Sequence, residues 1–254
     1  MKIRTGSIET NHELIGEGDC LVLIHGFSDN LTMWYNQVPQ FAKKHRVLAY
    51  DVRGHGSTEA PDDKISIDIL AEDLYELLHA LSIDKADVLG YSMGGRIAST
   101  FAIEHPDMIE GLILANSGIP GSGFRLSEEE MKAMEEKEVL MKNLLATEDI
   151  DSISEIMTAF SFSPGFQDRE PEIYQKYKDI KPLNTVKQKR QLSGSLALLK
   201  AYPRYCAVLF GRFIMLKFYP GRNKLPRVFC SAENVFDPSG SFRIANFAQI
   251  SLGG

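Results

Sequence analysis

The sequence predicts an α/β fold, namely a doubly wound, mostly parallel β-sheet with an inserted helical cap. Two observations lead to this fold class. Short, continuously apolar runs alternate with helical patterns over the first 117 residues, and a long stretch of helical pattern without a strand signal separates them from a second sheet-like region. Alternation of strands and helices implies right-handed crossovers between parallel strands.

Four apolar runs are the predicted strands of this sheet. Each is short, continuously hydrophobic and bounded by glycine or polar residues, which is typical of strands buried on both faces of a parallel sheet. They are CLVLIHGF (20–27), RVLAYDVRGHG (46–56), ADVLGYS (86–92) and GLILANS (111–117).

Three helical patterns lie between these runs. Residues 33–45 give the weakest one, because Pro39 interrupts it. Residues 66–81 carry an apolar stripe at helical spacing, and Ser66 or Asp68 can cap that helix. Residues 93–106 open on glycines and stop at Pro106.

The character of the chain changes after Gly118. Three strongly helical stretches follow, and SPGF (163–166) separates the first from the second. We therefore expect a helical cap over 120–202, inserted into a core formed by 1–119 and 203–254.

Bulk composition is that of an ordinary soluble domain, with 44% hydrophobic and 24% charged residues. A net charge of −6 argues against nucleic acid or an anionic membrane as a partner. The start is too polar for a signal peptide, and the apolar run 206–218 is too short and too interrupted by charge to span a bilayer. The three cysteines show neither a disulfide framework nor metal-ligand spacing. We expect a cytoplasmic protein with no cofactor and no metal.

The charge balance changes near residue 204. Residues 204–254 hold seven Lys and Arg against two Asp and Glu, whereas the whole chain holds 28 against 34. Seven of the 14 phenylalanines also lie there. Two explanations stay open: a basic edge of the fold, or a terminal segment that is not the sequence around which the rest of the chain was built.

The stretch Gly90-Tyr91-Ser92-Met93-Gly94 fits G-x-S-x-G and follows a predicted strand and precedes a predicted helix. This context is typical of a nucleophile presented on a strained strand-to-helix turn. Small residues are needed two before and two after the serine, because bulk there would clash with the neighbouring strand or helix. An ordinary tight turn is the other interpretation of the same five residues.

Two backbone amides are candidates for an oxyanion hole beside Ser92. The Met93 amide lies at the N-terminus of the predicted helix, where the helix dipole favours negative charge. The Phe27 amide follows the strand 20–24 in the His25-Gly26-Phe27 loop. We expect the His25 imidazole to brace that loop through hydrogen bonds.

The motifs HGFSDNLTMW (25–34), DVRGHGST (51–58), GYSMGGR (90–96) and EHPDMIEGLILANS (104–117), taken together, resemble the α/β-hydrolase superfamily. Their order and spacing are similar to its esterase, enol-lactonase and carbon–carbon-bond hydrolase branch, over roughly residues 1–119. The resemblance implies Ser92 as nucleophile and the Phe27 and Met93 amides as oxyanion donors. It also implies a structural role for Asp51, Arg53 and Gly54 at the sheet edge.

The resemblance fails at the end of the chain. The family's triad acid follows a late strand, and RVFCSAENVFDPSG (227–240) resembles that region, but Asn234 occupies the acid's position. Asp237 is the candidate acid, and Glu233 is the other nearby carboxylate. The family's histidine lies further on, yet none of the six histidines follows His105. We expect it to be missing through truncation or a changed reading frame, with His55 and His105 in surface or structural roles.

These features predict a serine hydrolase that acts on a small carboxylic ester or lactone through an acyl-enzyme, with activity in doubt because the triad histidine is absent. One alternative is a non-catalytic, α/β-hydrolase-like protein that binds a ligand or partner. Another is a carbon–carbon-bond hydrolase or an enzyme similar to the menaquinone-pathway synthase, which positively charged cap residues would favour. A homodimer is possible.

Overall fold

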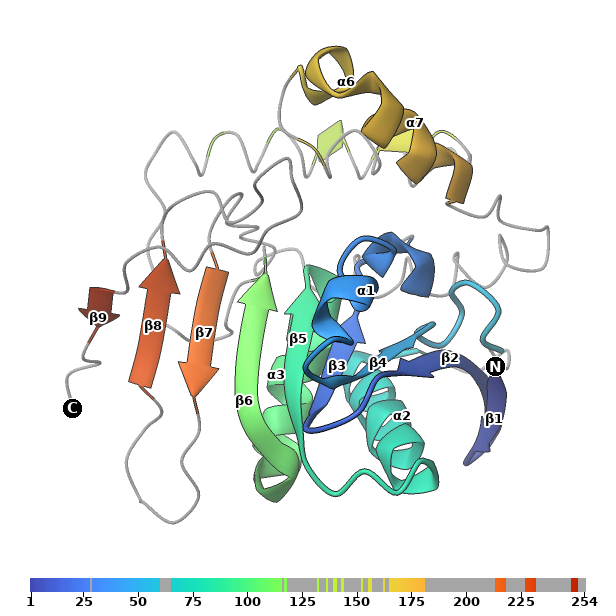
Figure 1. Cartoon of the computed structure of the whole chain (residues 1–254), viewed down its shortest axis with the longest axis vertical. Helices are drawn as coiled ribbons and strands as arrows, with labels where there is room; N and C mark the ends of the chain where they lie inside the picture. Colours follow the sequence, from blue (N-terminus) through green and yellow to red (C-terminus); the bar gives the residue numbers. More distant parts are fainter. Residues whose placement is uncertain are drawn as a thin grey trace.

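The computed structural model shows one nine-stranded sheet with helices on both faces and two further helices above the carboxyl ends of the central strands (Figure 1). The structure describes residues 1–27, 29–59, 65–115, 117 and 165–180, isolated positions between 132 and 162, and the backbone of 213–217, 227–231 and 248–250. Its strands are β1 (Lys2–Thr5), β2 (Ile8–Ile15), β3 (Cys20–Ile24), β4 (Arg46–Tyr50), β5 (Ala86–Tyr91), β6 (Ile109–Ala115), β7 (Phe213–Lys217), β8 (Arg227–Ser231) and β9 (Ala248–Ile250). Its helices are η1 (Leu31–Trp34), α1 (Val38–Phe41), α2 (Ile67–Ala80), α3 (Met93–Glu104), η2 (Pro106–Met108), α6 (Phe166–Arg169) and α7 (Pro171–Ile180).

The strand order is β1-β2-β4-β3-β5-β6-β7-β8-β9. The pairs β4–β3, β3–β5 and β5–β6 are parallel, so the four predicted strands form the parallel centre of the sheet. The exchange of β3 and β4 relative to chain order makes the chain cross over between them. The predicted fold class, an α/β sheet wound by helices on both faces, is confirmed.

Both edges of the sheet are antiparallel. At one edge β1 pairs with β2 and β2 with β4, and at the other β7 pairs with β6, β8 with β7 and β9 with β8. A parallel neighbour needs a crossover of about a dozen residues or more, and only 218–226 separate β7 from β8. The short connection therefore accounts for the antiparallel pairing of β7 with β8, where continued winding predicts parallel pairing.

Side chains of the central strands alternate between two cores. Along β3, Val22 and Ile24 pack with α2 and α3 on one face, whereas Leu21 and Leu23 pack with η1 and α1 on the other. All five β3 residues are buried. Burial on both faces explains why this strand reads as a continuous apolar run rather than an alternating one.

The helices of the core follow their sequence signals closely. The Ser66 side chain accepts a hydrogen bond from the Ile69 amide at 3.2 Å and so caps α2. The apolar stripe of α2 is buried, including Leu70, Leu74 and Leu77. The weak pattern around Pro39 forms only the short elements η1 and α1. None of the helices in the described ranges combines the length and apolarity needed to cross a bilayer.

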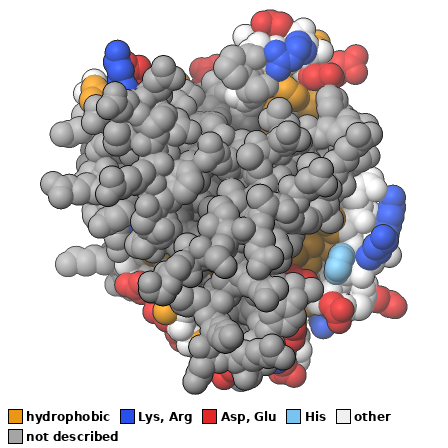
Figure 2. Space-filling view, turned by 90° about the vertical axis from the view of Figure 1, so that its left-hand side faces the viewer, with side chains coloured by type: hydrophobic (Ala, Val, Ile, Leu, Met, Phe, Trp, Pro, Cys, Tyr) orange, Lys and Arg blue, Asp and Glu red, His pale blue; other side chains and the backbone are white. Residues whose placement is uncertain are grey.

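The connection between β6 and β7 is an insertion of nearly a hundred residues, because these two strands are neighbours in the sheet. Its described helices, α6 and α7, lie above the sheet in Figure 1. The remainder of the predicted cap 120–202 falls almost wholly outside the described residues, so the predicted domain boundaries stay a prediction. At the top of Figure 2, acidic and basic side chains lie side by side over these helices.

Candidate active site

Ser92 lies at the junction of β5 and α3 with a strained backbone. Its φ is 52° and its ψ is −111°, and Ser82 is the other non-glycine residue with positive φ in the described part of the chain. Such backbone conformations cost about 1–3 kcal/mol and cluster at functional sites. The turn is held by the Ser92 amide, which donates to the Ala115 carbonyl of β6 at 2.9 Å.

The two glycines of the motif are required by close packing around this turn. A Cβ on Gly90 would overlap the carbonyl oxygen of Gly94, and a Cβ on Gly94 would overlap the carbonyl oxygen of Ile24 in β3. The start of α3 is thus pressed directly against β5 and β3. This contact turns the chain sharply and lifts Ser92 above the carboxyl edge of the sheet.

The N-terminus of α3 lies directly behind the serine. Met93 is the first residue of α3 and is buried, and the Gly95 amide bonds back to the Ser92 carbonyl at 3.1 Å. Amides in the first turn of a helix have no carbonyl acceptor within the helix and carry partial positive charge. The Met93 N–H therefore belongs to the group of donors that can bind an oxyanion.

The loop after β3 runs beside Ser92. Parallel register pairs Ile24 with Gly90, so Gly26 is level with Ser92 two residues further along each strand. A Cβ on Gly26 would lie 2.9 Å from the Tyr91 ring and 3.5 Å from the Ser92 Cβ. Phe27 follows this point of closest approach and Met93 follows Ser92 in the chain, so both predicted oxyanion donors belong to segments that adjoin Ser92.

The His25 imidazole braces this loop, as expected. Its Nδ1 lies 2.7 Å from the Gly26 carbonyl oxygen, and its Nε2 accepts the Val52 amide at 2.9 Å. Accepting at Nε2 leaves the proton on Nδ1, which donates to Gly26. Both nitrogens are therefore bonded to the backbone, which fixes the ring against the loop.

No hydrogen bond in the described part of the chain reaches the Ser92 hydroxyl. None of the six histidines of the sequence is bonded to it, and each lies elsewhere in the fold. His105 follows α3, a helix about 18 Å long, and stacks on Tyr75 with ring centroids 4.4 Å apart. His12 lies in β2, His45 precedes β4 and His79 lies in the last turn of α2.

The remaining histidine, His55, is buried rather than on the surface. Its Nδ1 lies 3.1 Å from the Arg53 carbonyl, and its ring is 5.9 Å from that of Phe27. Burial, and secondarily the neighbouring His25, lowers the pKa of His55 to about 4. The side chain is therefore a neutral packing partner beneath the Phe27 loop at neutral pH.

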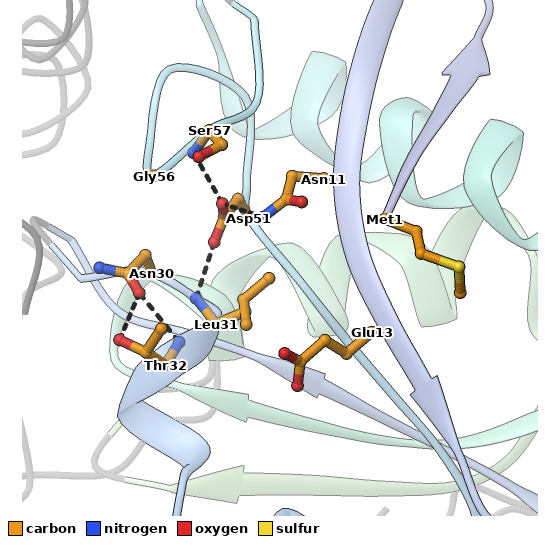
Figure 3. A pocket seen from close by; sticks show the side chains of 9 residues that line it. All are labelled: Met1, Asn11, Glu13, Asn30, Leu31, Thr32, Asp51, Gly56 and Ser57. Carbon is orange, nitrogen blue, oxygen red and sulfur yellow. Dashed lines mark hydrogen bonds between the residues drawn. The ribbon is translucent and has the colours of Figure 1, made fainter. Parts of the chain in front are cut away.

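Asp51 connects the loops at the sheet edge and lines a cavity of about 200 Å³ (Figure 3). Its carboxylate accepts from the Asn11 side chain at 2.8 Å, the Leu31 amide at 2.8 Å and the Ser57 amide at 2.7 Å. Ser92 does not line this cavity, which opens between β2 and the loops after β3 and β4. Asp51 therefore supports the fold of the loops, and the cavity is separate from the serine.

Arg53 pairs with Asp73 of α2 in a nearly buried, two-pronged contact, with Nε–Oδ2 at 2.6 Å and Nη2–Oδ1 at 2.5 Å. The pair ties the loop after β4 to the helix below it. Asp51 and Arg53 thus have the structural roles implied by the resemblance.

The predicted nucleophile and both predicted oxyanion donors converge at one edge of the sheet, whereas the candidate acid Asp237 lies outside the described residues. Sequence reasoning missed one contact at this edge. The Tyr177 hydroxyl of α7 donates to the Asp29 carboxylate at 2.7 Å, and both side chains are buried. The two residues are 148 positions apart, and no local pattern connects them.

The chain belongs to the α/β hydrolase fold family, whose model matches residues 19–205. The matched region ends beside the change in charge balance near residue 204. The family is one of hydrolytic enzymes, and the geometry of the turn at Ser92 agrees with the nucleophile elbow of that fold.

Two curated relatives share this family. The 2-hydroxymuconate semialdehyde hydrolase of Pseudomonas sp. (strain CF600) is 29% identical over 227 residues, covering 83% of this chain and 76% of its own length. The 3-oxoadipate enol-lactonase 2 of Acinetobacter baylyi is 30% identical over 171 residues, covering 66% of this chain and 60% of its own. Among solved structures, a thermophilic esterase from Thermogutta terrifontis is 26% identical with a TM-score of 0.60, covering 76% of this chain and 69% of its own.

Proposed function

We propose that this protein is a serine hydrolase that acts on small carboxylic esters or lactones through an acyl-enzyme on Ser92. The observation that carries the proposal is the strained Ser92 backbone, with φ at 52°, between the N-terminus of α3 and the Gly26-Phe27 loop. A turn that only reverses the chain has no need of a serine at positive φ, where glycine is less strained. A nucleophile held above the sheet requires it.

The chemistry follows from this geometry. The Ser92 Oγ attacks the carbonyl carbon, the carbonyl oxygen becomes an oxyanion, and the Phe27 and Met93 amides stabilise it. Collapse of the tetrahedral intermediate expels the alcohol, or opens the lactone, and leaves an ester on Ser92. Water then attacks this ester and releases the acid.

The attacking serine must lose a proton, and no described histidine is bonded to it. Removal of one triad member typically lowers turnover by about 10⁴–10⁶, whereas the oxyanion hole and binding alone retain about 10³–10⁴ over the reaction in water. We therefore propose slow turnover in which solvent water accepts the Ser92 proton.

The substrate class is supported by relatives rather than by a described pocket. One relative is named as an enol-lactonase and one structural neighbour as an esterase, both of which cleave a bond between an acyl carbon and oxygen. The relative named as a semialdehyde hydrolase supports carbon–carbon-bond hydrolysis as the second candidate. That candidate calls for positive charge above the serine. The helices α6 and α7 instead carry both signs, with Arg169, Lys176 and Lys178 alongside Asp168, Glu172 and Asp179.

A non-catalytic protein that binds a ligand or partner is the alternative from a different class. The lack of a described histidine bonded to Ser92 favours this alternative, whereas the strained Ser92 backbone favours a nucleophile. A cytoplasmic location and a homodimer remain predictions of the sequence.

Hydrolysis of p-nitrophenyl acetate and butyrate tests the proposal, with labelling by a fluorophosphonate probe as a second measurement. The proposal expects slow turnover and labelling, both lost in Ser92→Ala. The matched control is Ser117→Ala, since Ser117 is a buried serine next to the start of α3 whose hydroxyl lies against Gly95. This variant is expected to keep both signals. Equal, background rates in wild type and Ser92→Ala, without labelling, would instead support the binding protein.

A further inference from the structure

We propose that Tyr177 of α7 is a positioning residue that holds the loop 25–31, and with it the Phe27 amide, through its hydrogen bond to Asp29. The inference rests on the proposed function in taking Phe27 as an oxyanion donor. It adds to that function a role for the segment inserted between β6 and β7, which contributes a buried contact to the loop beside the nucleophile.

Asp29 closes the turn that presents the Phe27 amide. The Asp29 amide donates to the Gly26 carbonyl at 3.3 Å, which makes 26–29 a tight turn with Phe27 as its second residue. Gly26 lies against Ser92, so a shift of the turn changes the separation between the Phe27 amide and the serine. An oxyanion donor must lie about 2.7–3.1 Å from the developing charge, and a small displacement removes its effect.

The core fixes this loop at its two ends. His25 bonds to the Val52 amide at 2.9 Å at the beginning, and the Leu31 amide bonds to Asp51 at 2.8 Å at the end. Both partners belong to the loop after β4. Between these two anchors, the Tyr177–Asp29 bond joins the loop to α7, a described helix of the inserted segment.

Tyr177 is well placed to act at this point. It is 7% exposed and Asp29 is 6% exposed, so the 2.7 Å bond between them is shielded from water. The Tyr177 ring packs edge-on against Phe162 with centroids 5.1 Å apart. The neighbouring Lys176 ammonium lies 4.8 Å above the Tyr35 ring, immediately after η1. Charge-assisted hydrogen bonds shielded from water are among the stronger ones in proteins.

The geometry therefore couples the position of α7 to the position of the Phe27 amide. When α7 is docked, the bond holds Asp29 and the turn is fixed at three points. When α7 moves away, the turn loses the bond between Tyr177 and Asp29. Hydrolysis then depends on docking of the inserted segment, with the effect appearing in kcat rather than in substrate binding.

Tyr177→Phe tests this coupling, because it removes the hydroxyl and keeps the ring against Phe162. The matched control is Tyr174→Phe. Tyr174 lies on the same helix and also packs against Phe162, at 5.2 Å, and its hydroxyl has no partner among the described residues. Asp29→Asn is the conservative variant, since its side-chain oxygen still accepts the Tyr177 proton.

The first readout is amide hydrogen exchange in peptides covering 25–34, which does not require activity. Tyr177→Phe is expected to exchange roughly tenfold faster there than wild type, with Tyr174→Phe unchanged. Asp29→Asn is expected to lie between wild type and Tyr177→Phe, because a neutral acceptor makes a weaker bond. Unchanged exchange in Tyr177→Phe overturns the proposal, whether or not the protein hydrolyses any ester.

The second readout is the split between kcat and KM for a p-nitrophenyl ester. In Tyr177→Phe, kcat is expected to fall roughly tenfold at unchanged KM. Faster exchange with unchanged kcat would show that the bond holds the loop without positioning a catalytic group, which also overturns the proposal. Absence of turnover already in wild type counts against the proposed function, and the exchange measurement still decides whether Tyr177 holds the loop.

Discussion

The strain at Ser92 predicts that its replacement by glycine stabilises the protein while abolishing hydrolysis. Holding serine at φ 52° and ψ −111° costs the folded state about 1–3 kcal/mol. Glycine avoids most of this strain because it has no Cβ. Glycine is also more flexible in the unfolded chain, which costs about 0.5–1 kcal/mol. We therefore expect a net gain of about 0.5–2 kcal/mol in the free energy of unfolding for Ser92→Gly.

Ser92→Ala separates strain from the loss of the hydroxyl. Alanine keeps the Cβ, so this variant is expected to lose activity without gaining that stability. Urea unfolding can be followed by the fluorescence of Trp34, which is the chain's one tryptophan and is 4% exposed. In a domain of this size the expected gain corresponds to a rise of about 1–8 °C in Tm.

Ser82 provides a control away from the active site. It is exposed, follows α2 and has φ at 53°, so Ser82→Gly is expected to stabilise the protein while leaving hydrolysis unchanged. If Ser92→Gly proves no more stable than Ser92→Ala, the elbow stores no strain and the main support for a nucleophile at Ser92 is lost.

Three further perturbations follow from the described contacts. Arg53→Met leaves the Asp73 carboxylate nearly buried without its partner, which should lower the free energy of unfolding by about 3–5 kcal/mol, and adding Asp73→Leu should recover part of it in urea titrations. The pKa of His55 is about 4 in the folded protein against 6.5 ordinarily, so the unfolded chain binds the proton more tightly. The contribution of His55 to the free energy of unfolding is therefore full above pH 6.5 and is lost, by about 3 kcal/mol, as the pH falls from 6.5 to 4. Urea titrations of His55→Asn should lack this dependence. Gly26→Ala places a Cβ 2.9 Å from the Tyr91 ring, and ester hydrolysis should fall about 10²-fold in a protein whose circular dichroism is unchanged.

The central sheet could be predicted from the sequence because its signals are local. The run CLVLI is buried on both faces as β3, and the Ser66 cap begins α2 where the pattern placed it. The antiparallel pairing of β7 with β8 could not be predicted in this way. An apolar run identifies a strand but not its direction, which here depends on the short connection 218–226.

The candidate site also has parts with a local sequence signal and parts without one. The motif around Ser92 predicted the tight strand-to-helix turn, since the need for small residues at Gly90 and Gly94 arises within five positions of the chain. The role of Ser92 as nucleophile stays a prediction. The predicted acid, Asp237, had only a partial motif to support it and stays a prediction. The Tyr177–Asp29 bond had no sequence signal, because a hydrogen bond between residues far apart in the chain produces no repeating pattern in the sequence.

The sequence by itself determined the parallel centre of the sheet, the elbow at Ser92 and the loop beside it. Each depends on residues that contact their own neighbours, or on a pattern of burial that repeats along one element. The tertiary structure alone decided that Gly26 lies against Ser92, that both nitrogens of His25 are occupied by the backbone, and that α7 reaches Asp29. These arrangements depend on how separate elements pack, and packing is set by the whole chain rather than by any one segment.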